Sequence, residues 1–248
     1  MSPTRFAILC HPRTGSNYLC SLLNSHGDVL CHSEVFNDQA IYWALGYRDG
    51  RLDHLGDVAT RDADPAAFLE RVWSEDFGHG ALGIKLLVDQ ARDLWPRMVS
   101  DERVHKIVLW RRNHVRTYLS LLRARATGHY AHESYDGLRV RVDPAAFVAW
   151  AGDYDLFYQR LRATLAGQPW TDVNYEELVR DPAVGTRVLA FLGIDAQPGD
   201  AQSKLAKQSN DALRDAIENF DELSQALAGT RFRHELWETG PQTLRRPA

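Results

Sequence analysis

The sequence predicts an α/β fold in three layers, with a central, mostly parallel sheet flanked by helices. The order of its segments predicts this class, and its length and hydrophobic content predict the number of domains. Short apolar runs of strand length alternate with amphipathic helical segments along the chain, and strands that alternate with helices build parallel sheets. The chain has 248 residues, 44% of them hydrophobic, which suits one sizeable core. We therefore expect a single domain over residues 1–248.

The first half of the chain supplies three of the expected strands, at 5–10, 29–32 and 81–88. A helix should follow the first strand, because apolar residues from Tyr18 to Leu23 fall at helical spacing. Pro65 should open a second helix, and another should follow the third strand to about residue 99. Residues 37–64 are polar, aromatic and irregular. So long a connection in a compact domain is usually functional or mobile.

The second half supplies two more strands, at 106–110 and 172–174. Helical patterns carry Val115–Leu122, the long segment from Pro144, residues 184–192 and a last helix at about 211–228. Residues 127–143 form a loop rich in His and Tyr.

Composition narrows the class of protein. The net charge of −4 gives no global attraction to nucleic acid. No apolar run approaches the ~20 residues of a transmembrane segment, and the N-terminus lacks a secretion signal. Cys10, Cys20 and Cys31 lack metal-ligand spacing and should be buried free thiols in a reducing, cytoplasmic setting. No HExxH-type spacing occurs, so we expect no metal. Homo-oligomerisation stays open.

The segment His11–Asn17 lies between the first strand and the first helix, where backbone N–H groups and the helix dipole favour an anion. Gly15 allows close approach, Thr14, Ser16 and Asn17 can donate hydrogen bonds, and Arg13 adds a planar donor fork. An ordinary capped turn is the plainer alternative. A Walker A loop is excluded because no Lys follows the Gly, which disfavours a kinase or ATPase.

A second anion site is predicted where the strand at 106–110 ends in Arg111 and Arg112. Ser120 lies eight residues beyond Arg112, on the following helix. An Arg at a strand end and a Ser on the next helix can converge on one phosphate. A solvated Arg pair is the alternative. Two anion sites suit a cofactor with phosphate groups at both ends.

Pro12–Ser16, read Pro-Arg-Thr-Gly-Ser, resembles the 5′-phosphosulfate loop of sulfotransferases that use 3′-phosphoadenosine 5′-phosphosulfate (PAPS). Arg112 and Ser120 fit the family's 3′-phosphate pattern, Arg-[Asn/Asp] followed by Ser. Arg111 would fit if the register slips by one. The family often has Pro where this chain has His114, which leaves the turn open. The resemblance implies a P-loop-NTPase-like three-layer fold.

Further segments support the resemblance. The block from Tyr175-Glu176 to Phe191-Leu192-Gly193 is similar to the family block beside the adenine, so Tyr175 should touch the base. Cys31–Asn37 resembles the bacterial carbohydrate branch, which includes trehalose 2-sulfotransferase and Nod-factor-type enzymes. Lys207-Gln208 resembles a basic-Gln pair of that branch near the cofactor.

The resemblance implies the roles of three charged residues. Glu34 should be the general base for the acceptor hydroxyl; its pKa, about 4.3 when free, would need burial to raise it. Arg13 should stabilise the sulfonate and the bridging oxygen electrostatically, since Arg hardly ever releases a proton. Lys85 lies in an apolar strand, where a lone ammonium is costly, so it should face the crevice and meet an anion.

The sequence therefore predicts a PAPS-dependent sulfotransferase that releases 3′-phosphoadenosine 5′-phosphate (PAP) and acts on a hydroxyl of a carbohydrate, glycolipid or similar small acceptor. Residues 37–80 and 127–143 would be acceptor-side loops or a lid, with Tyr42, Trp43, Tyr47 and the His129–His132 segment as candidate lining. Two alternatives remain: a kinase-like nucleotide-dependent phosphotransferase, and a catalytically silent PAP- or nucleotide-binding protein.

Overall fold

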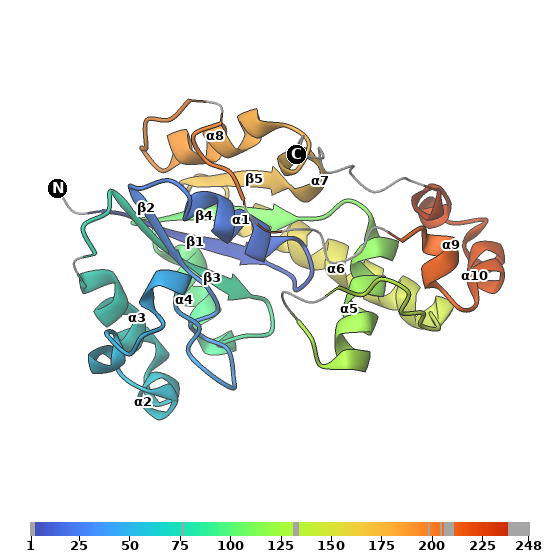
Figure 1. Ribbon diagram of the computed structural model, residues 1–248, viewed down its shortest axis with the longest axis horizontal. Coiled ribbons are helices and arrows are strands. Elements are labelled where there is room, and N and C mark those ends of the chain that lie inside the picture. The colour runs from blue at the N-terminus through green and yellow to red at the C-terminus, as the bar shows by residue number, and fades with distance from the viewer. Residues whose placement is uncertain are drawn as a thin grey trace.

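A computed structural model of the chain describes residues 3–75, 77–130, 134–197, 199–203, 205 and 211–237. At its centre lies a parallel sheet of five strands in the order β2-β3-β1-β4-β5 (Figure 1). The strands are β1 Thr4–Cys10, β2 Val29–His32, β3 Ala81–Leu87, β4 Val104–Trp110 and β5 Trp170–Asn174. The predicted α/β class and all five expected strands are confirmed.

The two neighbours of β1 hold it along its length, with Ile8 opposite Lys85 of β3 and Ile107 of β4. Gly83 of β3 makes room for the Phe6 ring, because a Cβ at Gly83 would lie 2.3 Å from a ring carbon. The carboxyl ends of parallel strands share one sheet edge, where open α/β sheets bind ligands.

Helices cover both faces of the sheet (Figure 1). Their bounds are α1 Ser16–Leu23, α2 Val58–Ala63, α3 Pro65–Ser74, α4 Trp95–Ser100, α5 His114–Thr127, α6 Pro144–Thr164, α7 Tyr175–Leu178, α8 Pro182–Phe191, α9 Leu213–Ala216 and α10 Phe220–Leu227. Short 3₁₀ turns lie at Leu45–Tyr47, Asp53–Leu55, Arg92–Leu94 and Arg231–Leu236.

Alternate residues of β1 pack into two different cores. Ala7 and Leu9 share a core with α3, α4 and α6, whereas Phe6 and Ile8 share one with α1 and α8. A third core joins α5, α6, α10 and the last 3₁₀ turn. This third core attaches the C-terminal part of the chain to the helix that follows the second predicted anion site.

The expected last helix at 211–228 is wrong, because the chain forms two short helices, α9 and α10, with a break between them. At this break Ile217 forms a β-bridge with Val140, and the Asn219 amide accepts from Val142 N (2.9 Å) and donates to Val142 O (2.8 Å). Backbone paired with a neighbouring segment in this way cannot continue a helix. No described helix has the length and apolar run that a membrane crossing needs.

Candidate functional site

The loop between β1 and α1 contains two residues in the left-handed region, Arg13 (φ 68°) and Gly15 (φ 91°). Thr14 is fully buried, and its hydroxyl donates to His11 O at 2.8 Å. Successive backbone N–H groups in such turns form concave anion-binding nests, and α1 begins at Ser16, directly after the loop. The geometry therefore fits a phosphate or sulfate group at the end of β1.

The ring of Tyr175 packs directly under Gly15. A Cβ at Gly15 would lie 2.1 Å from Tyr175 Cδ2, so only glycine fits here without movement. The guanidinium of Arg111 lies 5.0 Å from the centre of the same ring. The loop at the end of β1 and the turn at the end of β4 thus meet on one aromatic side chain at the start of α7.

The side chain of Arg13 extends from the first predicted anion site to the second. Its Nε donates to Ser120 Oγ on α5 at 3.0 Å, and its terminal nitrogens donate to Tyr130 O and, at 3.4 Å, to Tyr135 Oη. Burial lowers the pKa of this guanidinium, although nearby groups such as Tyr135 oppose the effect. A hydrogen bond therefore connects a residue of the first predicted site to a residue of the second.

Lys85 of β3 is 1% exposed, and its ammonium binds two side chains. Its Nζ lies 2.8 Å from Glu34 Oε1 and 2.5 Å from Asn17 Oδ1 in the first turn of α1. The second carboxylate oxygen of Glu34 accepts from Asn37 Nδ2 and Gln90 Nε2, both at 2.9 Å. The expected anionic partner of Lys85 is thus the carboxylate of Glu34.

The pKa of Glu34 is shifted in the direction opposite to the one expected. Burial acts to raise it, but the charge and hydrogen bond of Lys85, with the amides of Asn37 and Gln90, lower it below its usual value. Conversely, burial acts to lower the pKa of Lys85, while the attraction of Glu34 raises it. The ion pair therefore favours the charged form of both groups, and Glu34 is a carboxylate that is harder to protonate than a free Glu.

The two arginines after β4 have different environments. Arg111 is buried; its Nε lies 3.6 Å from Glu176 Oε1, and its side chain packs on Tyr175. Arg112 is exposed, and its guanidinium has no ion-pair partner among the residues that the structure describes. Its backbone N–H donates to Glu176 Oε2 at 3.0 Å. Arg112 thus presents an available cation, whereas the charge of Arg111 is partly neutralised.

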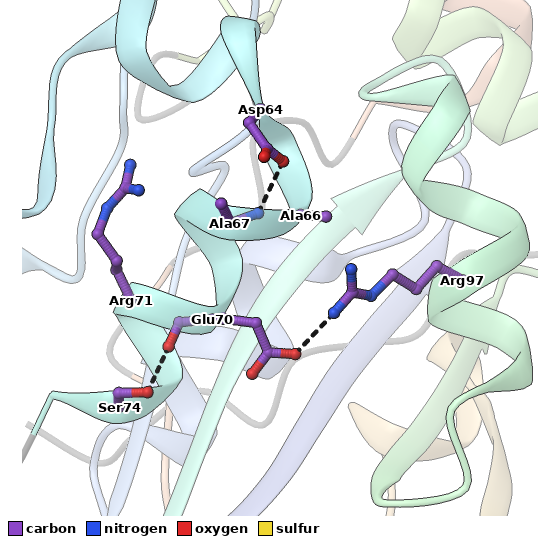
Figure 2. A pocket seen from close by; sticks show the side chains of 7 residues that line it. All are labelled: Asp64, Ala66, Ala67, Glu70, Arg71, Ser74 and Arg97. Carbon is purple, nitrogen blue, oxygen red and sulfur yellow. Dashed lines mark hydrogen bonds and ion pairs between the residues drawn. The ribbon is translucent and has the colours of Figure 1, made fainter.

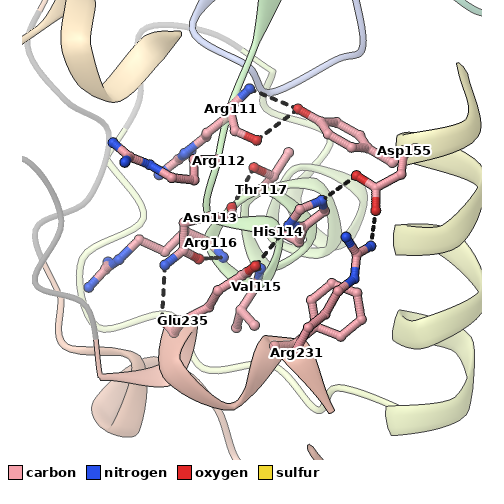
Figure 3. A network of polar contacts seen from close by, with 12 residues as sticks. Arg111, Arg112, Asn113, His114, Val115, Arg116, Thr117, Asp155, Arg231 and Glu235 are labelled. Carbon is pink, nitrogen blue, oxygen red and sulfur yellow. Dashed lines mark hydrogen bonds and ion pairs between the residues drawn. The ribbon is translucent and has the colours of Figure 1, made fainter. Parts of the chain in front are cut away.

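The N-terminus of α5 is occupied by side chains (Figure 3). Glu176 accepts from Asn113 N at 3.2 Å, and Glu235 accepts from Val115 N at 3.1 Å. His114, placed where the resemblance expects Pro, lies 2.8 Å from Glu235 and 2.9 Å from Asp155, and Arg231 pairs with Asp155. The backbone amides of Asn113 and Val115 at the start of α5 are therefore already paired with carboxylates.

Two tyrosines one turn apart on α6 fix the ends of β1 and β4. The hydroxyl of Tyr158 accepts from His11 N at 3.0 Å and donates to Leu109 O at 2.7 Å. The hydroxyl of Tyr154 accepts from Arg111 N at 2.8 Å and donates to Arg111 O at 3.0 Å. Sequence reasoning missed both, together with Glu176, Gln90 and Glu235, because nothing local to them points to the loops they hold.

The other predicted residues lie at the loop after β1, in the aromatic core, or outside the described part of the chain. Pro12, Ser16 and Asn17 lie in the loop or the first turn of α1. Trp43 and Tyr47, offered as acceptor lining, pack their rings against His32. Lys207, Gln208 and His132 lie outside the described residues.

A separate depression lies on α3 and α4 (Figure 2). Its lining contains none of the predicted site residues: Asp64, Ala66, Ala67, Glu70, Arg71, Ser74 and Arg97. Glu70 pairs there with Arg97 (3.0 Å) and with Arg5 at the amino end of β1 (3.3 Å). The depression therefore lies toward the sheet edge opposite the candidate site.

This chain is similar to a known protein family and, over most of its length, to curated proteins. A family model described as the sulfotransferase family matches residues 105–198. Nodulation protein H of Rhizobium tropici is 29% identical over 239 residues, which cover 92% of this chain and 91% of that protein. Nodulation protein H of Rhizobium meliloti (strain 1021) is 28% identical, with 90% and 91% covered.

Solved structures show the same fold. A sulfotransferase from Alicyclobacillus acidocaldarius superimposes with a TM-score of 0.50 at 16% identity, covering 96% of this chain and 97% of that one. The sulfotransferase domain from the curacin biosynthetic pathway gives a TM-score of 0.54 at 15% identity, covering 95% of each chain. At such low identity these structures support the fold alone.

Proposed function

We propose that this chain moves the sulfo group of PAPS to a hydroxyl of a carbohydrate, glycolipid or similar small acceptor. The match of residues 105–198 to the sulfotransferase family model and the similarity to nodulation protein H support the proposal. One observation carries the proposal. The anion loop and the carboxylate of Glu34 are joined through Asn17 and Lys85, with separations of 2.5 and 2.8 Å. A group bound in the loop and a hydroxyl beside Glu34 would therefore lie close together.

The residues present fit a cofactor with two anionic ends. The nest of Arg13–Gly15 and the start of α1 would hold the phosphosulfate end. Arg112, exposed and unpaired among the described residues, would hold the 3′-phosphate with Ser120. Tyr175, which contacts both loops, would pack on the adenine. Lys207 and Gln208 remain predicted cofactor contacts, and the proposed reaction needs no metal.

The bound cofactor would supply an activated sulfo group, and the chain's own residues would do the rest. Glu34 would take the proton from the acceptor hydroxyl, in the role of general base. Lys85 and Gln90 orient its carboxylate, and Lys85 keeps it ionised. Arg13 would exchange its present partner, Ser120, for the oxygens that gain charge during transfer.

The aromatic rings between Gln90, which binds Glu34, and His11 of the anion loop support a sugar-like acceptor. Trp95 Nε1 donates to the carbonyl of Gln90 at 3.1 Å, and Trp95 packs edge-on to Phe157, which packs edge-on to His11. Burial lowers the pKa of His11 to about 4, so its ring is neutral, and its buried Nε2 has no partner among the described residues. Ligand pockets typically combine such aromatic walls with a few polar groups.

The cofactor can be tested before any acceptor is known. In a thermal-shift screen, PAP should stabilise the protein, whereas ADP, ATP and NAD should not, since ligands that bind only the folded state raise its stability. Preferential stabilisation by ATP with Mg²⁺ would favour the phosphotransferase alternative and refute the proposal.

The role of Glu34 needs a second experiment. Glu34→Gln should keep the thermal shift with PAP and lose sulfo transfer, while Glu102→Gln, an exposed change before β4, should alter neither. Labelled PAPS and a panel of saccharide and glycolipid acceptors would measure transfer. A wild-type protein that binds PAP but transfers to no acceptor would match the catalytically silent alternative.

A further inference from the structure

Two cysteine thiols are in contact on the sheet face beneath the anion loop, and the proposed reaction uses neither. Cys20 lies on α1 and Cys31 on β2; both are buried, and their Sγ atoms are 3.5 Å apart. Cys10, at the end of β1, is the third free thiol. A disulfide bond needs an Sγ–Sγ distance of about 2.05 Å, so Cys20 and Cys31 would have to approach further.

We propose that Cys20 and Cys31 form a peroxide-sensitive dithiol, which closes to a disulfide and thereby slows sulfo transfer. The two cysteines lie on α1 and β2, the elements that carry or precede Asn17 and Glu34. Cys20 follows Asn17 on α1, and Cys31 is three residues before Glu34. A covalent bond between them would displace Asn17 or Glu34 relative to Lys85, which binds both.

The local structure already holds the two segments together. At the end of α1, Asn24 donates to Cys31 O at 2.8 Å and accepts from Cys31 N at 2.7 Å. This pair of hydrogen bonds fixes α1 against β2 beside the thiols. The remaining approach of the sulfur atoms therefore needs side-chain rotation and a small shift, not a rearrangement of the chain.

The chemistry assigns different roles to the two thiols. Cys20 is 6% exposed and Cys31 fully buried, so a peroxide should reach Cys20 first. The hydrogen bond from Cys31 and the charge of Lys85 lower the pKa of Cys20, although its burial opposes them. The pKa of Cys31 is raised, mainly by burial and also by its contact with Cys20. The thiolate, the form that peroxide oxidises, is therefore favoured at Cys20.

Two steps balance the reaction. The Cys20 thiolate attacks one oxygen of hydrogen peroxide and becomes a sulfenic acid, while hydroxide leaves and takes up a proton as water. The Cys31 sulfur then attacks the Cys20 sulfur, and a second water leaves. Overall, the two thiols lose two protons and two electrons, and the peroxide takes up both and is reduced to two waters. Dithiothreitol should reverse the change.

Cys10 provides a matched control. It is buried like the others, and burial raises its pKa to about 12, so it should stay a thiol. The full-length reduced protein would be treated with hydrogen peroxide, alkylated and mapped by mass spectrometry. We expect a Cys20–Cys31 cross-linked peptide, two hydrogens lighter than the reduced pair, and alkylated Cys10.

Activity measurements complete the test. Peroxide should slow transfer about ten-fold or more in the wild type and in Cys10→Ala, since small displacements at a reacting site have large effects, and dithiothreitol should restore it. Cys20→Ala and Cys31→Ala, checked for folding by thermal melting, should resist peroxide. A disulfide to Cys10, the absence of any disulfide, or an unchanged rate after cross-linking would each overturn the proposal.

If the reduced protein neither binds PAP nor transfers a sulfo group, the proposed function fails, and the disulfide map still decides whether the dithiol exists.

Discussion

Lys85 and Glu34 form an ion pair of 2.8 Å whose ammonium is almost completely buried. Without its partner, either charge would be costly in this environment. Lys85 comes from β3, an interior strand of the sheet, and Glu34 from the loop after β2. The pair thus connects the core of the fold to the residue that we propose as general base.

Replacing Lys85 should move the pH dependence of the reaction. Glu34 has a lowered pKa in the wild type, so transfer should be lost only as the pH falls below the usual Glu value of about 4.3. In Lys85→Met the charge and hydrogen bond of Lys85 are lost, and only the amides of Asn37 and Gln90 still oppose burial, so the pKa of Glu34 rises. The acid limb of the single-turnover rate should therefore move to higher pH.

Lys106→Met is the control for this change. Lys106 is also buried, but its ammonium binds Asp101 O and Gln168 near the amino end of β4. The variant should lose stability and keep the wild-type acid limb. If Lys85→Met also kept that limb, the ion pair would not set the ionisation of Glu34.

The two arginines after β4 should respond differently to truncation. Arg112→Ala removes an exposed cation, so PAP affinity should fall by about 1.5–3 kcal/mol, as for a charged hydrogen bond, while the melting temperature of the free protein stays the same. Arg111→Ala leaves Glu176 without its ion pair and should lower the free energy of unfolding. Calorimetric titration and thermal melting separate the two effects. An Arg112→Ala protein with wild-type PAP affinity would assign the 3′-phosphate to Arg111 instead.

Adding one methyl group at Gly15 should damage the anion loop. In Gly15→Ala the Cβ meets the ring of Tyr175 and the residue stays at positive φ, so PAP binding should be lost or severely weakened. Gly15→Ala with Tyr175→Leu should recover part of the folding stability, because the clash is relieved and only backbone strain remains. Gly27→Ala, where nothing lies within 4 Å of the new Cβ, should behave as wild type. Equal stability of Gly15→Ala and wild type would refute the close contact.

Removing the hydroxyl of Tyr154 or of Tyr158 on α6 should destabilise the loops that these hydroxyls bind. Tyr154→Phe removes the hydrogen bonds to Arg111 N and O, and Tyr158→Phe removes those to His11 N and Leu109 O. Each should cost about 1–3 kcal/mol of unfolding free energy, measured by urea denaturation, and should also weaken PAP binding. Tyr42→Phe, an exposed change, should do neither. Variants with unchanged stability would show that these hydroxyls do not support the loops.

Local patterns were enough to predict the five strands, the turn between β1 and α1 and the pairing of Lys85 with an anion. They depend on a run of apolar residues or on one charged residue within such a run, which neighbouring sequence reveals. The predictions failed where distant segments decide the outcome. The break at Ile217–Asn219 depends on pairing with Val140–Val142, and nothing between 211 and 228 signals it.

The same reason explains the residues that were missed. Tyr154 bonds a backbone group 43 residues away, and Glu235 bonds one 120 residues away. Their side chains are common in helices and turns, so sequence gives them no special meaning. The direction of the Glu34 pKa shift also required the structure, because burial and an ion pair have opposite effects.

The hydrogen bonds of Asn24 have a consequence for how the molecule behaves among its copies. β2 is the outermost strand on its side of the sheet, and an unprotected outer strand can recruit a strand from another molecule. Because Asn24 satisfies both backbone groups of Cys31, a foreign strand finds neither donor nor acceptor at this residue. The amide that ends the first helix thus blocks the pairing of a foreign strand at Cys31.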